Sequence, residues 1–306
     1  MHTHPTIAFF GTPELCLPIL DMLAQHGFSP ALVITNPDRP VGRKFIMTPP
    51  PAKVWAQEHN IPVLQPEKLN NDFKTAFEAH HIDLSIVVAY GKIMPNWLIE
   101  MPKYQTLNIH YSLLPKYRGA SPVESALLHG ETETGVCIQK MVHAMDAGPL
   151  VACETISIQT NETHEELRNR LNVIGAQMLV NTIPEYIAGK ITPAEQVGDP
   201  SYCYRTEKGD GEVHLETMSP VELWNRYRAY YGWPGIFFFD TDGKRANPHT
   251  NSKYTKHGKK NNLLQDNSTR IGVRVKITKA RFEGGKFVIE KVIREGERET
   301  SYHSMN

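Results

Sequence analysis

The sequence has little cysteine and no long apolar run. Its 306 residues hold four cysteines without CxxC spacing, which argues against a disulfide framework or a thiolate zinc site. We therefore expect reduced, mostly buried thiols at Cys16, Cys137, Cys153 and Cys203. No stretch approaches the roughly 18 to 20 apolar residues of a membrane span, and the N-terminus MHTHPTIAFFGTPE lacks the basic region of a signal peptide. These absences predict a cytoplasmic protein.

Phosphate-binding and metal-binding motifs are also missing. The chain contains neither GxGxxG nor GxxxxGK[ST], so the sequence supports neither dinucleotide nor triphosphate binding. Its histidine clusters, His2 with His4 and His80 with His81, have no carboxylate at a familiar metal spacing. We predict that no metal is bound.

The length and composition describe a globular protein of two domains. Apolar residues make up 40% and charged residues 22% of the chain. The net charge is zero, but residues 241–306 contain 15 Lys and Arg against 7 Asp and Glu. This end of the chain is therefore suited to a polyanion, although a solvated lysine-rich face gives the same count.

Short apolar runs alternate with helical patterns in the first part of the chain. Most of these runs are rich in β-branched residues, as buried parallel strands are, and they span residues 6–10, 31–35, 61–64 and 83–90. A helical pattern follows Gly11, and a long amphipathic helix is expected from about Asn161 to Ile187. The pattern predicts a Rossmann-like, doubly wound α/β domain over residues 1–189, with its site near residues 11, 36, 91 and 108.

Breakers at Gly189, Pro193, Gly198 and Pro200 indicate a linker over residues 190–206. The remainder, 207–306, begins with the helical segment PVELWNRYRAY and continues with the alternating segments WPGIFFF, RIGVRVKITKARF and KFVIEKVI. We expect a smaller, OB-like β-barrel here, with a loop at 243–268 and a turn between the last two strands at Glu283-Gly284-Gly285-Lys286.

The stretch LNIHYSLLPKYRGASP places Asn108 and His110 two residues apart on a predicted strand, and therefore on one face. An amide and an imidazole side by side suit acyl transfer, because both can donate to a developing oxyanion and the imidazole can relay a proton. Asp146, in MVHAMDAGPL, is the candidate carboxylate that orients the ring.

Six segments give the chain a resemblance to a known family. They are FFGTPE, TNPDRPVGRK, VVAYGKIMP, SLLP, KYRGASP and MDAGPL, in this order along the chain. With them the sequence resembles the 10-formyltetrahydrofolate-dependent formyltransferases over most of residues 5–205.

The resemblance implies roles for particular residues. Asn108, His110 and Asp146 match the catalytic triad of the family, which needs no metal. The segment Ser112, Leu113, Leu114 and Pro115 matches the part that lines the folate site, and Val88, Tyr90 and Gly91 lie in the segment expected to hold the pterin ring. Arg43 and Lys44 lie in a basic loop that contacts tRNA in the family, although Phe45 and Ile46 replace further lysines there. Its several prolines predict that this loop is irregular.

The same resemblance, together with the basic loop and a basic C-terminal domain that would bind tRNA, favours formylation of the amino group of initiator methionyl-tRNA. We expect a monomer by default. Three alternatives remain: an N-formyltransferase for a nucleotide-linked amino sugar, a non-catalytic folate- or RNA-binding protein, and a hydrolase that passes the formyl group to water. The catalytic residues alone do not separate the first of these from formylation of tRNA.

Overall fold

The computed structural model describes residues 4–42, 44–240 and 272–302. The chain divides into two compact units, each described here by itself. Unit 1 consists of Met1–Arg118, Glu133–Ser157 and Arg168–Ser201, and unit 2 of Gly119–Thr132, Ile158–Leu167 and Tyr202–Asn306. Over the described ranges, no helix is both long and apolar enough to cross a membrane.

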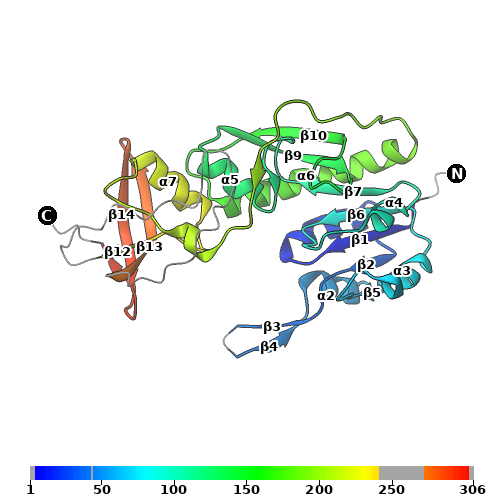
Figure 1. Cartoon of the computed structure of the whole chain (residues 1–306), viewed down its shortest axis with the longest axis horizontal. Coiled ribbons are helices and arrows are strands. Elements are labelled where there is room, and N and C mark those ends of the chain that lie inside the picture. Colours follow the sequence, from blue (N-terminus) through cyan, green and yellow to red (C-terminus); the bar gives the residue numbers. More distant parts are fainter. Residues whose placement is uncertain (1–3, 43, 241–271, 303–306) are drawn as a thin grey trace. The chain divides into compact units, whose positions relative to one another are not determined.

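Unit 1 is built on a seven-stranded sheet in the order β10-β9-β7-β6-β1-β2-β5 (Figure 1). Its strands are β1 (Ile7–Gly11), β2 (Leu32–Ile34), β5 (Val63–Leu64), β6 (Leu84–Val88), β7 (Thr106–His110), β9 (Glu133–Lys140) and β10 (Leu150–Ser157). The five strands from β7 to β5 are parallel, whereas β9 and β10 are antiparallel to their neighbours. The four predicted strands are present as β1, β2, β5 and β6, which confirms the α/β prediction.

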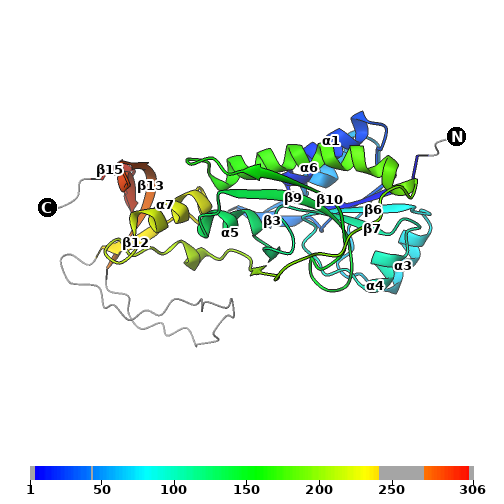
Figure 2. The same cartoon turned by 90° about the horizontal axis from the view of Figure 1, so that it is seen from above.

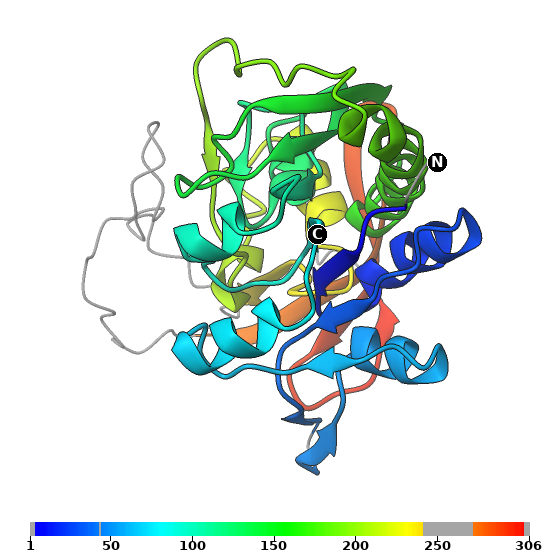
Figure 3. The same cartoon turned by 90° about the vertical axis from the view of Figure 1, so that its right-hand side faces the viewer.

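Helices cover both faces of this sheet. They are η1 (Glu14–Cys16), α1 (Leu17–Gln25), α2 (Pro51–Glu58), α3 (Asn71–Glu78), α4 (Asn96–Glu100) and α6 (His164–Ile187), of which residues 168–187 belong to unit 1. Figures 2 and 3 show α1 and α6 on one side of the sheet and α3 and α4 on the other. On the second side, Phe10 packs against Phe77 and Tyr90. On the first, a Cβ atom on Gly175 of α6 would lie 3.2 Å from both Ile109 and Val136, so the helix packs closely on β7 and β9.

Strands β9 and β10 form a pair that the sequence interpretation missed, and this pair corrects one expectation. Their register places Cys137 opposite Cys153, with Cα atoms 4.1 Å apart, and a disulfide joins them. The expectation of four reduced thiols is therefore wrong for these two, because cross-strand pairing brings them together. It is confirmed for Cys16 and Cys203, which are buried and not part of a disulfide, and burial raises the pKa of the Cys16 thiol to about 12.

The basic segment after β2 is more regular than expected. The prolines predicted an irregular loop, but β3 (Arg39–Val41) pairs antiparallel with β4 (Ile46–Thr48). Both strands are exposed along their whole length. The segment is therefore a short hairpin of unit 1, and Arg43 in its turn lies outside the described residues.

Unit 2 contains a four-stranded antiparallel sheet in the order β12-β13-β14-β15. Its elements are α5 (Pro122–Leu128), η2 (Lys208–Gly211), α7 (Pro220–Ala229), β12 (Phe237–Asp240), β13 (Val273–Glu283), β14 (Lys286–Arg294) and β15 (Thr300–Ser301). The short strands β8 (Arg118–Gly119) and β11 (Tyr202–Cys203) complete the list of elements. The sheet fits the predicted small β domain, while the segment 243–268 lies outside the described residues.

Local sequence explains the boundaries of these elements. Ser219 caps α7 by accepting a hydrogen bond from the backbone N–H of Glu222, whose carboxylate accepts one from the Ser219 N–H. These bonds hold the pKa of the Glu222 carboxyl below its usual range. Gly284 and Gly285, both with positive φ, form the turn predicted between β13 and β14.

Candidate active site

Asn108 and His110 lie in the last three residues of β7. The intervening Ile109 faces α6, so the side chains of Asn108 and His110 emerge on the opposite face of the sheet. The His110 side chain is only 6% exposed. The predicted pair is therefore present on one face, at the carboxyl end of a parallel strand, where α/β folds place their sites.

Asp146 lies in the loop between β9 and β10 and approaches the same imidazole. Its Oδ2 is 3.6 Å from His110 Nδ1, a distance longer than a hydrogen bond. The other ring nitrogen, Nε2, is 2.9 Å from the carbonyl oxygen of Tyr117 and donates to it. Both ring nitrogens therefore face an oxygen atom of the chain.

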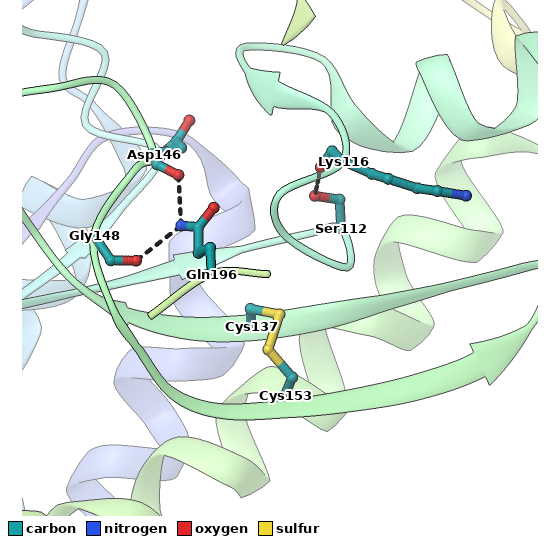
Figure 4. The surroundings of a disulfide bond; sticks show 7 residues. All are labelled: Ser112, Lys116, Cys137, Asp146, Gly148, Cys153 and Gln196. Carbon is teal, nitrogen blue, oxygen red and sulfur yellow. Dashed lines mark hydrogen bonds between the residues drawn. A yellow bond between two sulfur atoms is a disulfide. The ribbon is translucent and has the colours of Figure 1, made fainter. Parts of the chain in front are cut away.

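The loop that carries Asp146 is tightly folded. Asp146 has φ +47°, a left-handed conformation, and a Cβ atom on Gly148 would lie 1.8 Å from the Lys140 carbonyl oxygen, so this position admits only glycine. Gln196 donates from one amide nitrogen to the carbonyl oxygens of Asp146 and Gly148, at 2.8 Å each (Figure 4). Arg118 in turn donates to Gln196 Oε1, at 3.1 Å from Nε and 2.6 Å from Nη2.

The segment expected to line a folate site follows β7 directly. Ser112 is fully buried, and its hydroxyl donates to the carbonyl oxygen of Lys116 at 2.6 Å. The peptide bond between Leu114 and Pro115 is cis. Leu113 packs onto Gly135 of β9, where a Cβ atom would come within 2.4 Å of it. The segment is thus a fixed turn beside His110.

The second predicted folate segment follows β6, the neighbour of β7 in the sheet. Tyr90 directs its ring into the core, at 5.4 Å from that of Phe10, and burial raises the pKa of its phenol. Its carbonyl oxygen instead accepts from the side chain of Asn36 at 3.1 Å. The carbonyl of Val88 accepts from the Cys16 thiol, and Gly91 has φ +79° and is exposed. Here a ligand would meet backbone rather than the tyrosine ring.

Of the two predicted tRNA contacts, Lys44 is exposed in the hairpin turn, and Arg43 lies outside the described residues. In the part of the chain that the structure describes, no three His, Cys, Asp or Glu side chains are grouped so as to hold a metal ion. The roles of these residues remain predictions.

Comparisons with known proteins decide the family. The profile described as Formyl transferase matches residues 6–183. A curated methionyl-tRNA formyltransferase of Listeria monocytogenes serovar 1/2a is 42% identical over 232 residues, which cover 74% of this chain and 73% of the relative. This chain belongs to the methionyl-tRNA formyltransferase family. One in Geobacillus sp. is 39% identical over 232 residues, covering 74% of this chain and 72% of the relative.

Solved structures share the fold. A methionyl-tRNA formyltransferase from Clostridium thermocellum has a TM-score of 0.57 and 14% identity, and the match covers 95% of this chain and 98% of that one. An N-formyltransferase from Helicobacter canadensis, solved with folinic acid and dTDP-3-aminofucose, has a TM-score of 0.58 and 20% identity, covering 74% and 81%. At these identities the likeness concerns the fold alone.

Two residues that the sequence interpretation did not single out contact the loop or the side chain of Asp146, one of the predicted catalytic residues. Gln196 holds the Asp146 loop, and Gln139 of β9 donates to Asp146 Oδ1 at 2.7 Å. The spacing of Gln139, seven residues before Asp146, gave no signal, because strand β9 was not recognised. Gln196 lies in the expected linker, where a polar residue needs no special explanation.

Proposed function

We propose that this chain transfers the formyl group of 10-formyltetrahydrofolate to the free amino group of initiator methionyl-tRNA, giving N-formylmethionyl-tRNA. The observation that carries this conclusion is the identity of about two residues in five with curated methionyl-tRNA formyltransferases over three quarters of the chain. The association of His110 with Asp146 at the end of β7 supports the chemistry.

The folate would bind beyond the carboxyl ends of β6 and β7. These strands are parallel neighbours, with Val87 opposite Asn108, so the segments that follow them leave the sheet at the same edge. The left-handed backbone at Ala89 and Gly91 turns the chain there, and its peptide groups offer hydrogen bonds to the amide-like edge of a pterin. Ser112–Pro115 form the other wall.

In the reaction the substrate amine attacks the formyl carbon, and a tetrahedral intermediate with a negative oxygen forms. Asn108 donates to this oxygen, and protonated His110 donates to it once its Nε2–H turns away from the Tyr117 carbonyl, while Asp146 holds His110 and assists removal of the amine proton. As the intermediate collapses, the bond from carbon to N10 of the folate breaks. The proton that the amine loses balances the one that N10 gains, so no net proton is consumed.

Recognition of tRNA falls to two surfaces in this proposal. One is the β3–β4 hairpin with Arg43 and Lys44, since a planar guanidinium suits phosphate contacts. The other is the C-terminal domain, residues 207–306 after a linker at 190–206, an OB-like β-barrel whose end carries 15 basic against 7 acidic residues over 241–306. We propose a cytoplasmic monomer.

The first test is formyl transfer from 10-formyltetrahydrofolate to charged initiator methionyl-tRNA. Uncharged tRNA and a panel of nucleotide-linked amino sugars serve as parallel acceptors. Transfer to the charged tRNA alone is expected. Transfer only to a sugar would keep the chemistry and overturn the acceptor, and a chain that transfers to neither would overturn the enzymatic function.

A second test separates the acceptor from the folate. Arg43→Ala is expected to lower kcat/KM for methionyl-tRNA by roughly tenfold, the value of one lost charged hydrogen bond, and to leave folate binding unchanged. Folate affinity is measured by titration. An Arg43→Ala variant with unaltered tRNA kinetics would show that the hairpin assignment is wrong.

A further inference from the structure

Each carboxylate oxygen of Asp146 lies close to a polar side chain. Oδ2 faces His110 Nδ1 at 3.6 Å, and Oδ1 accepts a hydrogen bond from Gln139 Nε2 at 2.7 Å. Gln139 is 1% exposed and lies on β9, a strand of the central sheet. The side chain thus reaches the reacting groups from a rigid element.

The register of the sheet explains why Gln139 meets the site. Gln139 lies directly opposite Asn108 in the antiparallel pair of β7 and β9. Paired residues extend to the same face, so Gln139 shares the face of Asn108 and His110, while Val136 packs toward α6 on the other. Gln139 is therefore part of the same wall as the two predicted catalytic residues of β7.

Packing alone does not account for a glutamine at this position. A buried amide is costly unless its groups are hydrogen-bonded, and among the described residues Gln139 Oε1 has no partner. Its amino group donates to the Asp146 carboxylate. A methionine of similar volume would fill the space without the unpaired oxygen, so what distinguishes glutamine here is its donor.

We propose that Gln139 is a positioning residue that fixes the rotation of the Asp146 carboxylate, an inference that rests on the proposed function. The terminal torsion of an aspartate is broad, so a carboxylate held at one oxygen only can turn away from its partner. Gln139 occupies Oδ1 and leaves Oδ2 directed at His110. Gln196 holds the backbone of Asp146, and Gln139 sets the direction of its side chain.

The test compares Gln139→Met in two backgrounds. In the native chain it should lower kcat for formyl transfer to methionyl-tRNA about tenfold to a hundredfold, the usual effect of losing a hydrogen bond to a charged group, with both KM values nearly unchanged. In an Asp146→Ala background the same substitution should not lower kcat further, because the carboxylate it serves is gone. Gln177→Met, on the exposed side of α6, is the matched control.

The outcomes separate the possible explanations. An equal fold-loss in both backgrounds, or a loss in KM rather than kcat, would show a general packing role and overturn the positioning role. Full activity of Gln139→Met in an active native chain would also overturn it and leave the proposed function intact. A native chain that formylates no acceptor would overturn the proposed function, and the positioning role with it.

Discussion

The two halves of the candidate site are held in different ways. Asn108 and His110 lie on β7, whose backbone pairs with β6 on one side and β9 on the other. Asp146 lies in a loop with left-handed backbone, and its position depends on side chains, chiefly those of Gln196 and Gln139. A residue on a central strand is held by many backbone hydrogen bonds of the sheet. A loop residue is held by a few side-chain hydrogen bonds, each of which a single substitution can remove.

The largest effect is expected from removing the imidazole of His110, which lies on strand β7. His110→Ala should lower kcat by roughly a hundredfold to ten-thousandfold, the usual range for a group that transfers a proton, because it removes the imidazole that faces Asp146. Single-turnover formylation is the measurement. The melting temperature should stay close to the native value, and a large fall would indicate that misfolding causes the loss.

A smaller effect is expected from removing the hydrogen bonds that hold the backbone of the Asp146 loop. Gln196→Met removes two hydrogen bonds to the carbonyl oxygens of Asp146 and Gly148. We expect kcat to fall roughly threefold to tenfold, the value of a neutral hydrogen bond, while His110 stays in place. Steady-state kinetics measure this change. If Gln196→Met lowered kcat as much as His110→Ala, the hydrogen bonds that hold the Asp146 loop would be as essential to activity as the imidazole itself. The proposed difference between the two halves of the site would then be wrong.

The disulfide ties the base of the same loop, since Cys137 and Cys153 flank the segment that carries Asp146. Cys153→Ser should lower the free energy of unfolding by about 3 kcal/mol in the chain-entropy description of a closed loop of this length. Because the β9–β10 pairing remains, kcat should change less than with Gln196→Met. Denaturant unfolding of the variant, beside the native chain with and without reductant, measures the effect.

The smallest effect is expected at Asp38, a second aspartate whose carboxylate accepts a hydrogen bond from a glutamine. Hydrogen bonds from Gln65, at 2.8 Å, and from Lys53 lower the pKa of the Asp38 carboxyl below 3.8. A lowered pKa contributes stability above the unfolded value, and this contribution is lost as the pH falls through the folded value. Gln65→Met should therefore lower the melting temperature slightly at pH 6, and less below about pH 3.8. The side chain of Asp38 is 33% exposed, so solvent screening keeps the effect small.

This last comparison also bears on Asp146, which is half as exposed, at 16%. If Gln65→Met impaired formyl transfer as much as Gln139→Met does, the effect of Gln139 would not depend on its place beside His110. Equal kcat values for the two variants would therefore remove the distinction between the two aspartates.

The sequence by itself determined the α/β class and the strand-borne half of the site. The runs at 6–10 and 83–90 became strands because buried parallel strands are continuously apolar, and alternation along a strand places Asn108 and His110 together whatever surrounds them. It also predicted α7 and the β13–β14 turn, since capping and glycine turns are local.

Only the tertiary structure decided what holds Asp146. The partners Gln139 and Gln196 lie seven and fifty residues from it, and they meet it because β9 pairs with β7 and the chain after α6 passes beside the loop. The disulfide has the same origin, since Cys137 and Cys153 are joined by the register of two strands that the sequence interpretation did not recognise. Contacts between distant residues depend on strand register and loop path, which a local pattern does not encode.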